Sequence, residues 1–159
     1  MKLRKAMCQR GFTLTELVVV IVIAGILGAV AVPRLLDSSD IDQAGAVSEV
    51  KAALQYARKT SIYSRRHVCV SVAGNQLSIT RDPALPESVT TPNCSQTLDL
   101  PVSRADCAKN AVCPPAGVAV SMVPASFSFS AGRGSASATV VVTIAGVPVT
   151  VDATTGIAQ

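Results

Sequence analysis

The chain has 159 residues, of which 49% are hydrophobic, 15% are charged and 3% are aromatic. This length leaves room for one small domain beside a membrane anchor. The formal net charge of +4 is misleading, because residues 1–11 hold four of the fourteen Lys and Arg residues and none of the ten acids. The rest of the chain is formally neutral, which argues against a strongly basic nucleic-acid-binding domain.

A short basic segment, residues 1–11, precedes an apolar run from Phe12 to Val32 whose single charge is Glu16. At about 1.5 Å per residue, a helix over this run is roughly 30 Å long, which matches the core of a bilayer. A chain this small could hardly cover such a helix on all sides. We therefore predict a transmembrane segment over residues 12–34, with the basic N-terminus in the cytoplasm and the rest exported.

A secretory signal peptide also has a basic start and an apolar core, but it ends in a small-residue cleavage site. Here the run passes into Ala31-Val32-Pro33-Arg34 without a clean site of that kind. Glu16 is also unusual, since a carboxylate in a spanning segment costs about 2.5–3.5 kcal/mol on insertion scales. Either its side chain reaches the headgroups from the helix end, or it pairs with a cation from another subunit.

Pro33 follows the apolar run and either ends the helix or kinks one that continues. The polar residues around Asp40 and Asp42 supply a cap and first-turn acids for a second helix. Beyond them, apolar residues recur at helical spacing, namely Ile41, Ala44, Val47, Val50, Leu54 and Ala57. This pattern predicts a helix over residues 40–64 with its apolar stripe packed on a sheet.

From His67 onward the hydrophobic period changes to two. The segments 67–72 and 77–80 predict a hairpin with Gly74-Asn75 in its turn. Residues 82–117 are rich in Pro, Ser, Asn and Cys and predict a long surface loop. Further strands are expected at 118–123, 127–130, 139–145 and 147–152, with Gly146 and Pro148 at the last turn. The predicted fold class is α+β: a long N-terminal helix followed by a mostly antiparallel β region, residues 66–159.

Four cysteines follow the apolar run, Cys69, Cys94, Cys107 and Cys113. An even number in an oxidising compartment indicates two disulfides, and of the three possible pairings we favour Cys69–Cys94 with Cys107–Cys113. A zinc site that includes His67 is the alternative, but no Cys-x-x-Cys spacing supports it. With one histidine and no Gly-x-Ser-x-Gly elbow, we expect no enzyme activity, metal or cofactor.

The order of a basic leader, Gly11, Phe12, Glu16 and an apolar helix resembles the class III signal of type IV prepilins and type II secretion pseudopilins. The resemblance implies that prepilin peptidase cuts between Gly11 and Phe12 and that Phe12 becomes N-methylated. It also implies that Glu16 neutralises the terminal amine of a neighbouring subunit during assembly. Thr15 stands where the family more often has an apolar residue.

The same resemblance implies a pilin-like exported domain over residues 35–159. The chain would be a minor pilin or pseudopilin of the inner membrane that assembles with other subunits on an inner-membrane platform. A weaker likeness to the GspH/FimT branch lies in Ala57-Arg58, Arg65-Arg66 and Gly156-Ile157. The cysteines would also suit a mannose-sensitive haemagglutinin-type pilus. A pilus-associated DNA-binding or adhesion module is the alternative, but residues 154–159 contain no base, which argues against nucleic acid as a partner.

Overall fold

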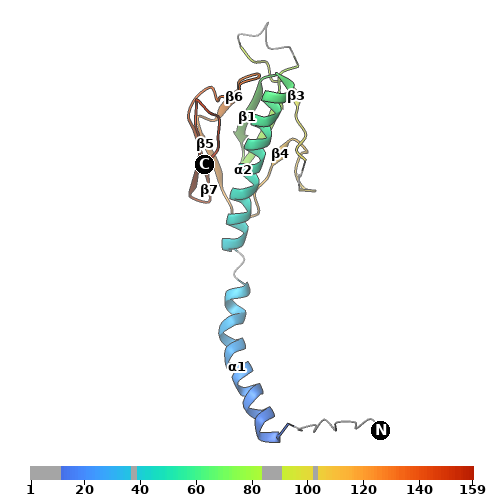
Figure 1. Ribbon diagram of the computed structural model, residues 1–159, viewed down its shortest axis with the longest axis vertical. Coiled ribbons are helices and arrows are strands. Elements are labelled where there is room, and N and C mark those ends of the chain that lie inside the picture. Colours follow the sequence, from blue (N-terminus) through green and yellow to red (C-terminus); the bar gives the residue numbers. More distant parts are fainter. Residues whose placement is uncertain (1–11, 37–38, 84–90, 102–103) are drawn as a thin grey trace, which may run out of the picture. The chain divides into compact units, whose positions relative to one another are not determined.

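A computed structural model describes residues 12–36, 39–83, 91–101 and 104–159. Within these ranges the side chains are described except at residues 30–36 and 39. The predicted leader, residues 1–11, lies outside the described residues. The chain divides into two compact units, Met1–Ser38 and Ser39–Gln159, and each is described by itself below (Figure 1).

The first unit contains helix α1, Leu14–Leu36. The helix does not stop at Pro33, which lies inside it. As far as the helices are described, none is long and apolar enough to cross a membrane. Residues 30–34 of the predicted segment lie outside the described side chains, so the transmembrane assignment stays a prediction.

The second unit begins with α2, Ser39–Ser64, whose start lies one residue before the predicted one. Its buried side chains follow the helical period and are Ala46, Val50, Ala53, Leu54 and Ala57. This face contacts strands of both sheets. The helix ends where Arg65 takes a left-handed backbone conformation, with φ of 53°, which is a common way to leave a helix.

The larger sheet contains β1 (Val68–Ala73), β2 (Gln76–Arg81), β3 (Gln96–Thr97), β4 (Ala111–Val112) and β6 (Ser126–Phe129). All its pairings are antiparallel in the order β3-β2-β1-β6, and β4 also pairs with β2. The β1–β2 hairpin turns at Gly74 and Asn75, whose φ values are both positive, as a two-residue turn of this type requires. This is the turn predicted from the sequence.

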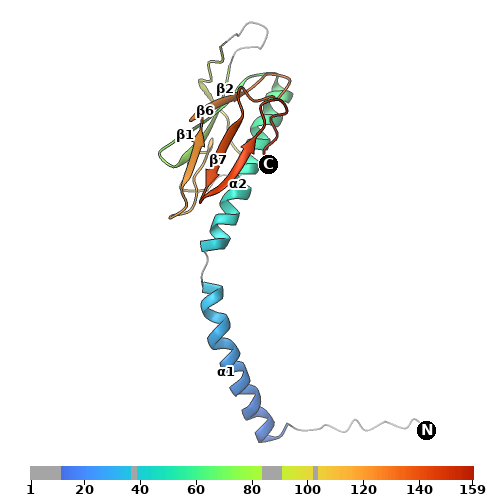
Figure 2. The ribbon, with the colours of Figure 1, turned by 90° about the vertical axis from the view of Figure 1, so that its left-hand side faces the viewer.

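The smaller sheet has the order β5-β7-β8 and is also antiparallel. Its strands are β5 (Val120–Val123), β7 (Val140–Ile144) and β8 (Val147–Val151), which agree with the predicted strands (Figure 2). The turn between β7 and β8 consists of Ala145 and Gly146, both at positive φ. Pro148 was expected at this turn but lies in β8 opposite Thr143. The α+β fold class is confirmed.

The segment 82–117 was expected to be a loop, but its described part contains β3 and β4. Both strands have two residues and add to the outer edge of β2. The structure joins Cys69 to Cys94 and Cys107 to Cys113, which is the pairing favoured from the sequence. The first disulfide connects β1 to the chain just before β3, and the second encloses β4. These bonds leave no thiolate of the four to bind zinc.

The C-terminus returns to the smaller sheet and to α2. Thr150 and Gln159 exchange two backbone hydrogen bonds of 3.0 and 2.9 Å, so the end of the chain covers the outer edge of β8. The Arg58 Nε atom of α2 donates to the Thr155 carbonyl oxygen at 2.7 Å. A Cβ atom on Gly156, whose φ is 66°, would collide with the carbonyl oxygen of Gly134.

We predict that Gly156→Ala destabilises the protein more than Gly146→Ala. Both substitutions put a side chain at positive φ, which costs about 1–2 kcal/mol. Only the first adds a clash with backbone, which costs about 1–3 kcal/mol more. Urea unfolding of the two variants and the wild type in detergent measures the difference. Equal losses of unfolding free energy would show that the C-terminal loop moves away from Gly134 at little cost.

Candidate functional site

Helix α1 begins with a hydrogen-bonded cap at Thr13. The Thr13 Oγ1 atom accepts a hydrogen bond from the Glu16 amide at 3.3 Å, and the Thr13 carbonyl oxygen accepts the first helical bond, from the Leu17 amide, at 3.2 Å. The Thr13 hydroxyl also lies 3.5 Å from the Glu16 Oε2 atom. Thr13 and Glu16 therefore occupy the two positions of a capping box, with the hydroxyl in the capping role.

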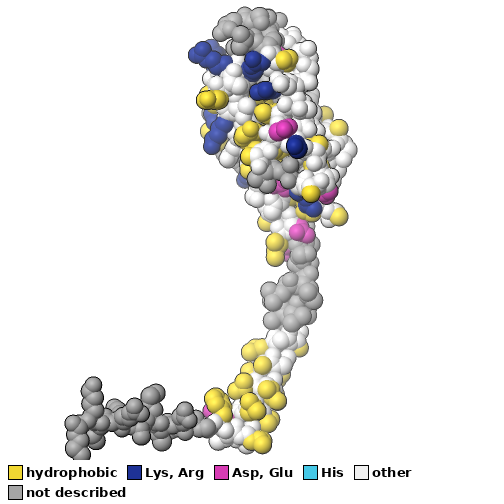
Figure 3. All heavy atoms as spheres, turned by 90° about the vertical axis from the view of Figure 1, so that its right-hand side faces the viewer, with side chains coloured by type: hydrophobic (Ala, Val, Ile, Leu, Met, Phe, Trp, Pro, Cys, Tyr) yellow, Lys and Arg dark blue, Asp and Glu magenta, His cyan; other side chains and the backbone are white. Residues whose placement is uncertain are grey.

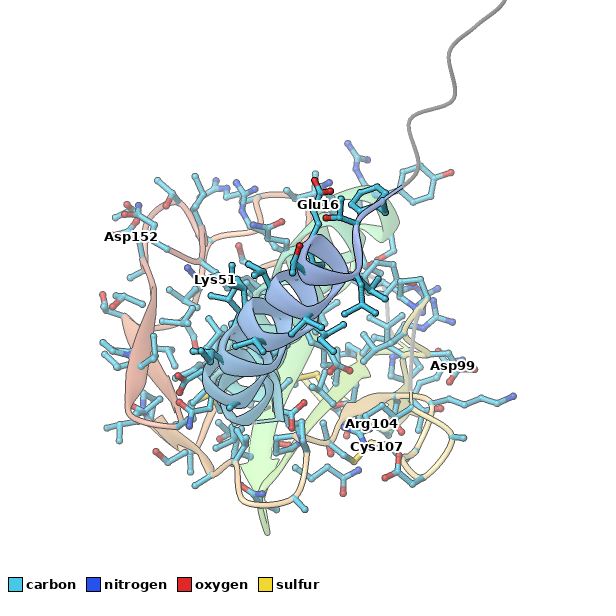
Figure 4. The ribbon with its side chains drawn as sticks, turned by 90° about the horizontal axis from the view of Figure 1, so that it is seen from below. Glu16, Lys51, Asp99, Arg104, Cys107 and Asp152 are labelled. Atoms are coloured by element: carbon cyan, nitrogen blue, oxygen red, sulfur yellow. A yellow bond between two sulfur atoms is a disulfide. The ribbon has the colours of Figure 1, made fainter. Side chains whose placement is uncertain are left out.

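The carboxylate of Glu16 lies in the first turn of α1, near the positive end of the helix dipole. The side chain is exposed and projects from the start of the helix (Figure 4). No ion pair of Glu16 is present among the residues that the structure describes. A carboxylate can accept about four hydrogen bonds, so the weak contact with Thr13 leaves most of this capacity for a donor from outside the chain.

From Leu17 to Leu27 the surface of α1 is apolar on every side. Large exposed hydrophobic side chains occupy consecutive positions, Leu17, Val18, Val19, Val20, Ile21, Val22 and Ile23, and continue at Ile26 and Leu27. In Figure 3 hydrophobic side chains accordingly cover the described part of this helix. A helix that is apolar all round must be covered by lipid or by other protein. Among the described residues, no atom lies within 4 Å of the Cβ positions of Gly25 and Gly28, so another helix could approach closely there.

Phe12, the predicted first residue after cleavage, lies just before the cap and is 76% exposed. Gly11, on the other side of the predicted cleavage site, lies outside the described residues. The structure thus places Phe12 and Glu16 at one end of α1, four residues apart in the sequence. Pro33 lies near the other end of the helix, and the four cysteines belong to the second unit.

The second unit offers little that resembles a catalytic or metal site. Within the described residues, no group of three or more His, Cys, Asp or Glu side chains could hold a metal ion. The Nδ1 atom of His67 is buried and has no hydrogen-bond partner among the residues with described positions. Arg66 donates to the backbone oxygens of Asp82 and Pro83, so this arginine holds the start of the long loop.

Asp152 was missed by the sequence analysis. Its Oδ1 atom accepts hydrogen bonds from the backbone N–H and hydroxyl groups of Thr154 and Thr155, at 2.6 to 3.0 Å. These bonds, led by the Thr154 hydroxyl, lower the pKa of Asp152 from 3.8 to about 2. The Asp-x-Thr-Thr-Gly order is a signal for such a turn. The carboxylate therefore shapes the loop that contacts Arg58, and Figure 4 shows it at the edge of the unit.

Three comparisons relate the chain to known proteins. Residues 6–32 match the family described as the prokaryotic N-terminal methylation motif. The chain is 49% identical over 51 residues to the type IV narrow pilus major component PilA5 of Thermus thermophilus, covering 32% of this chain and 44% of that one. It is 38% identical over 81 residues to the type II secretion system core protein G of Klebsiella michiganensis, covering 50% and 56%. The chain thus spans about half the length of these relatives.

Among solved structures, the chain is similar to the type IV minor pilin FimU of Pseudomonas aeruginosa. The sequence identity is 16% and the TM-score is 0.47, with 77% of this chain and 90% of that chain covered. A second crystal form of the same protein gives a TM-score of 0.48 at 17% identity.

We predict that Asp152 stabilises the second unit at neutral pH and ceases to do so in acid. Its pKa is lower in the folded protein than the ordinary 3.8, so its contribution is complete above that value and is lost as the pH falls toward 2. Thermal unfolding of the wild type and of Asp152→Asn as a function of pH measures this. The wild type should be the more stable at neutral pH, and the difference should shrink between pH 3.8 and about 2. A difference that does not change across this range would contradict the prediction.

Proposed function

This chain is a relative of type IV pilins and type II secretion pseudopilins that carries their N-terminal methylation motif, and from that premise we propose how it works as a filament subunit. In the proposal it is a minor pilin or pseudopilin. Residues 1–11 are a leader, prepilin peptidase cuts between Gly11 and Phe12, and Phe12 is N-methylated. The single observation that carries the proposal is a capped helix with an exposed apolar surface from Leu17 to Leu27, whose one carboxylate, Glu16, lies in its first turn.

Proteins of this superfamily are membrane-anchored and associated with a pilus or pseudopilus. For this chain we propose an inner-membrane anchor over residues 12–34, with the N-terminus in the cytoplasm and the domain 35–159 in the periplasm. The basic residues before Phe12 favour this orientation. Assembly then transfers the apolar surface of α1 from lipid to a bundle of like helices, on an inner-membrane platform and beside other subunits.

Glu16 guides this transfer by charge. In the bilayer its carboxylate is costly, on the order of 2.5–3.5 kcal/mol, and the terminal amine of a neighbouring Phe12 offsets that cost. The cap at Thr13 makes the arrangement effective, because it holds the first turn of α1 without using the charge of Glu16. Helical addition of like surfaces then builds a fibre instead of a closed ring.

A DNA-binding function finds less support in the structure. Arg58 is hydrogen-bonded to the Thr155 carbonyl oxygen, and Arg66 to those of Asp82 and Pro83. Two of the bases near the end of α2 are thus occupied within the unit. The finer assignment to the GspH/FimT branch or to a mannose-sensitive haemagglutinin-type pilus remains a prediction from the sequence.

We predict that the mature chain begins at N-methylated Phe12. Mass spectrometry of the N-terminal peptide from membranes and from sheared filaments measures this directly. Gly11→Val should leave the leader attached, because the residue before the cut then carries a branched side chain. An intact Met1 in the wild type, or a cut near Ala31, would contradict the proposal.

We predict that Glu16→Gln inserts into the membrane normally but enters filaments about tenfold less often. Glutamine preserves the capping box and removes only the charge, and hydrogen bonds to charged groups contribute about 1.5–3 kcal/mol. Thr13→Ser is the matched control, because it retains both the hydroxyl and the carboxylate. Immunoblots of the membrane and sheared-filament fractions measure the ratio. Normal incorporation of Glu16→Gln would eliminate the pairing role.

A further inference from the structure

Asn75 makes a contact that its place in a turn does not require. Together with Gly74 it forms the turn of the β1–β2 hairpin, at a φ of 66°. Its side-chain amide reaches beyond the hairpin: the Nδ2 atom donates to the Val118 carbonyl oxygen at 3.0 Å, and the Oδ1 atom accepts from the Val120 amide at 2.6 Å. Val120 is the first residue of β5. One side chain thus connects the tip of a hairpin in the larger sheet to the smaller sheet.

The two hydrogen bonds lie on the outer edge of β5. On the inner edge, the Ala145 amide donates to the Ala119 carbonyl oxygen at 2.9 Å. Because the backbone groups of successive strand residues point to opposite sides, those of Val118 and Val120 face away from β7. Within the described part of the smaller sheet, β5 is the outermost strand. Asn75 therefore occupies the place that a residue of a neighbouring strand would take.

Few directional contacts join the two sheets to each other. Among the described strands, no strand of one sheet pairs with a strand of the other. The Val72 amide of β1 donates to the carbonyl oxygen of Ala125, which lies between β5 and β6, at 3.0 Å. The two sheets also share one hydrophobic core, but hydrophobic burial is not directional. The bonds of Asn75 are therefore what hold the start of β5 against the β1–β2 hairpin.

Asparagine meets three requirements at position 75. The turn requires a positive φ, which Asn adopts several-fold more often than most residues. The Val118 carbonyl oxygen requires a donor and the Val120 amide requires an acceptor, and a side-chain amide supplies both. Glycine would form a turn of this type equally well, but it has no side chain, and Asp has no donor when ionised. The turn alone thus does not explain why the residue is an asparagine.

The surroundings of the contact make it costly to break. Val118 and Val120 are 5% and 7% exposed, so their side chains belong to the core and hold the backbone groups in place. A backbone group that loses its partner in such a site loses more free energy than the bond itself contributes, because water replaces the partner poorly. Removal of the Asn75 amide should therefore loosen the start of β5.

We propose that the Asn75 side chain is a latch between the two sheets, which makes them open and close as one unit. Without the latch, the smaller sheet opens by itself while the larger sheet stays folded. The smaller sheet also carries the C-terminal closure, in which Gln159 pairs with Thr150 of β8. Release of the latch therefore loosens the side of the unit that contains the C-terminus. The latch acts within one chain and does not depend on assembly into a filament.

Hydrogen exchange of the full chain in detergent, followed by NMR, tests the latch. In the wild type, the amides of β5 and β7 should be protected to a similar degree as those of β1 and β2, since parts that open together exchange together. Asn75→Gly is the decisive variant, because it keeps the turn and removes the amide. Its Val120 amide should exchange about tenfold faster, as expected for the loss of one hydrogen bond of ordinary strength. Exchange in β5 and β7 should accelerate more than exchange in β1 and β2.

Asn75→Asp is the matched control. It keeps the acceptor for the Val120 amide but places a carboxylate against the Val118 carbonyl oxygen, so its exchange rates should lie between those of the wild type and Asn75→Gly. If Asn75→Gly does not accumulate as a folded protein, the comparison of Asn75→Asp with the wild type decides the question in the same way. Unchanged exchange at Val120 would overturn the latch. Acceleration of all strands by one factor would overturn it as well, because it would show that the shared core alone couples the sheets.

Discussion

The uncovered apolar surface of α1 is the constraint on which the rest of the protein depends. Large hydrophobic side chains occupy every position from Leu17 to Ile23. Four Lys and Arg residues precede them in the sequence, within residues 1–11. Such a helix is stable only in lipid or among other apolar helices. In the proposed function this surface is covered by lipid before assembly and by other helices after it.

Different parts of α1 have different structural roles. At its start, the Thr13 cap satisfies one of the backbone donors that a helix end leaves free, the Glu16 amide, so the carboxylate of Glu16 is not required to hold the turn. In its middle, Gly25 and Gly28 leave space for close packing. The apolar surface of the helix can be covered equally by lipid or by other apolar helices. The carboxylate of Glu16 instead requires a cation or a hydrogen-bond donor. On the described surface of α1, Glu16 is the charged group, and the proposed function therefore assigns recognition of the neighbour to it.

The second unit achieves its stability with few large side chains. Its fully buried residues include one Phe, with Leu, Ile and Val for most of the rest, and the chain adds two disulfides and a C-terminal closure. Arg58, Gly134 and Gly156 bring α2, the loop after β6 and the end of the chain together. One face of α2 is buried against the strands, and the other face is left exposed by this unit.

The features that could be predicted from the sequence are those that depend on residues close together in the chain. The apolar helix, the period of α2 and the Gly74-Asn75 turn depend on residues close in the chain, so patterns of spacing predict them. The strands β3 and β4 have two residues each, which is too short for a hydrophobic period to appear in the sequence. They form because one edge of β2 is open to pairing, and that edge exists only once the sheet has folded. The closure by Gln159 and the contact of Arg58 with Thr155 also join distant parts of the chain. The sequence by itself thus determined the helices, the longer strands and the charged end of α1. The tertiary structure decided which edges and faces are covered, because burial depends on partners that are far away along the chain.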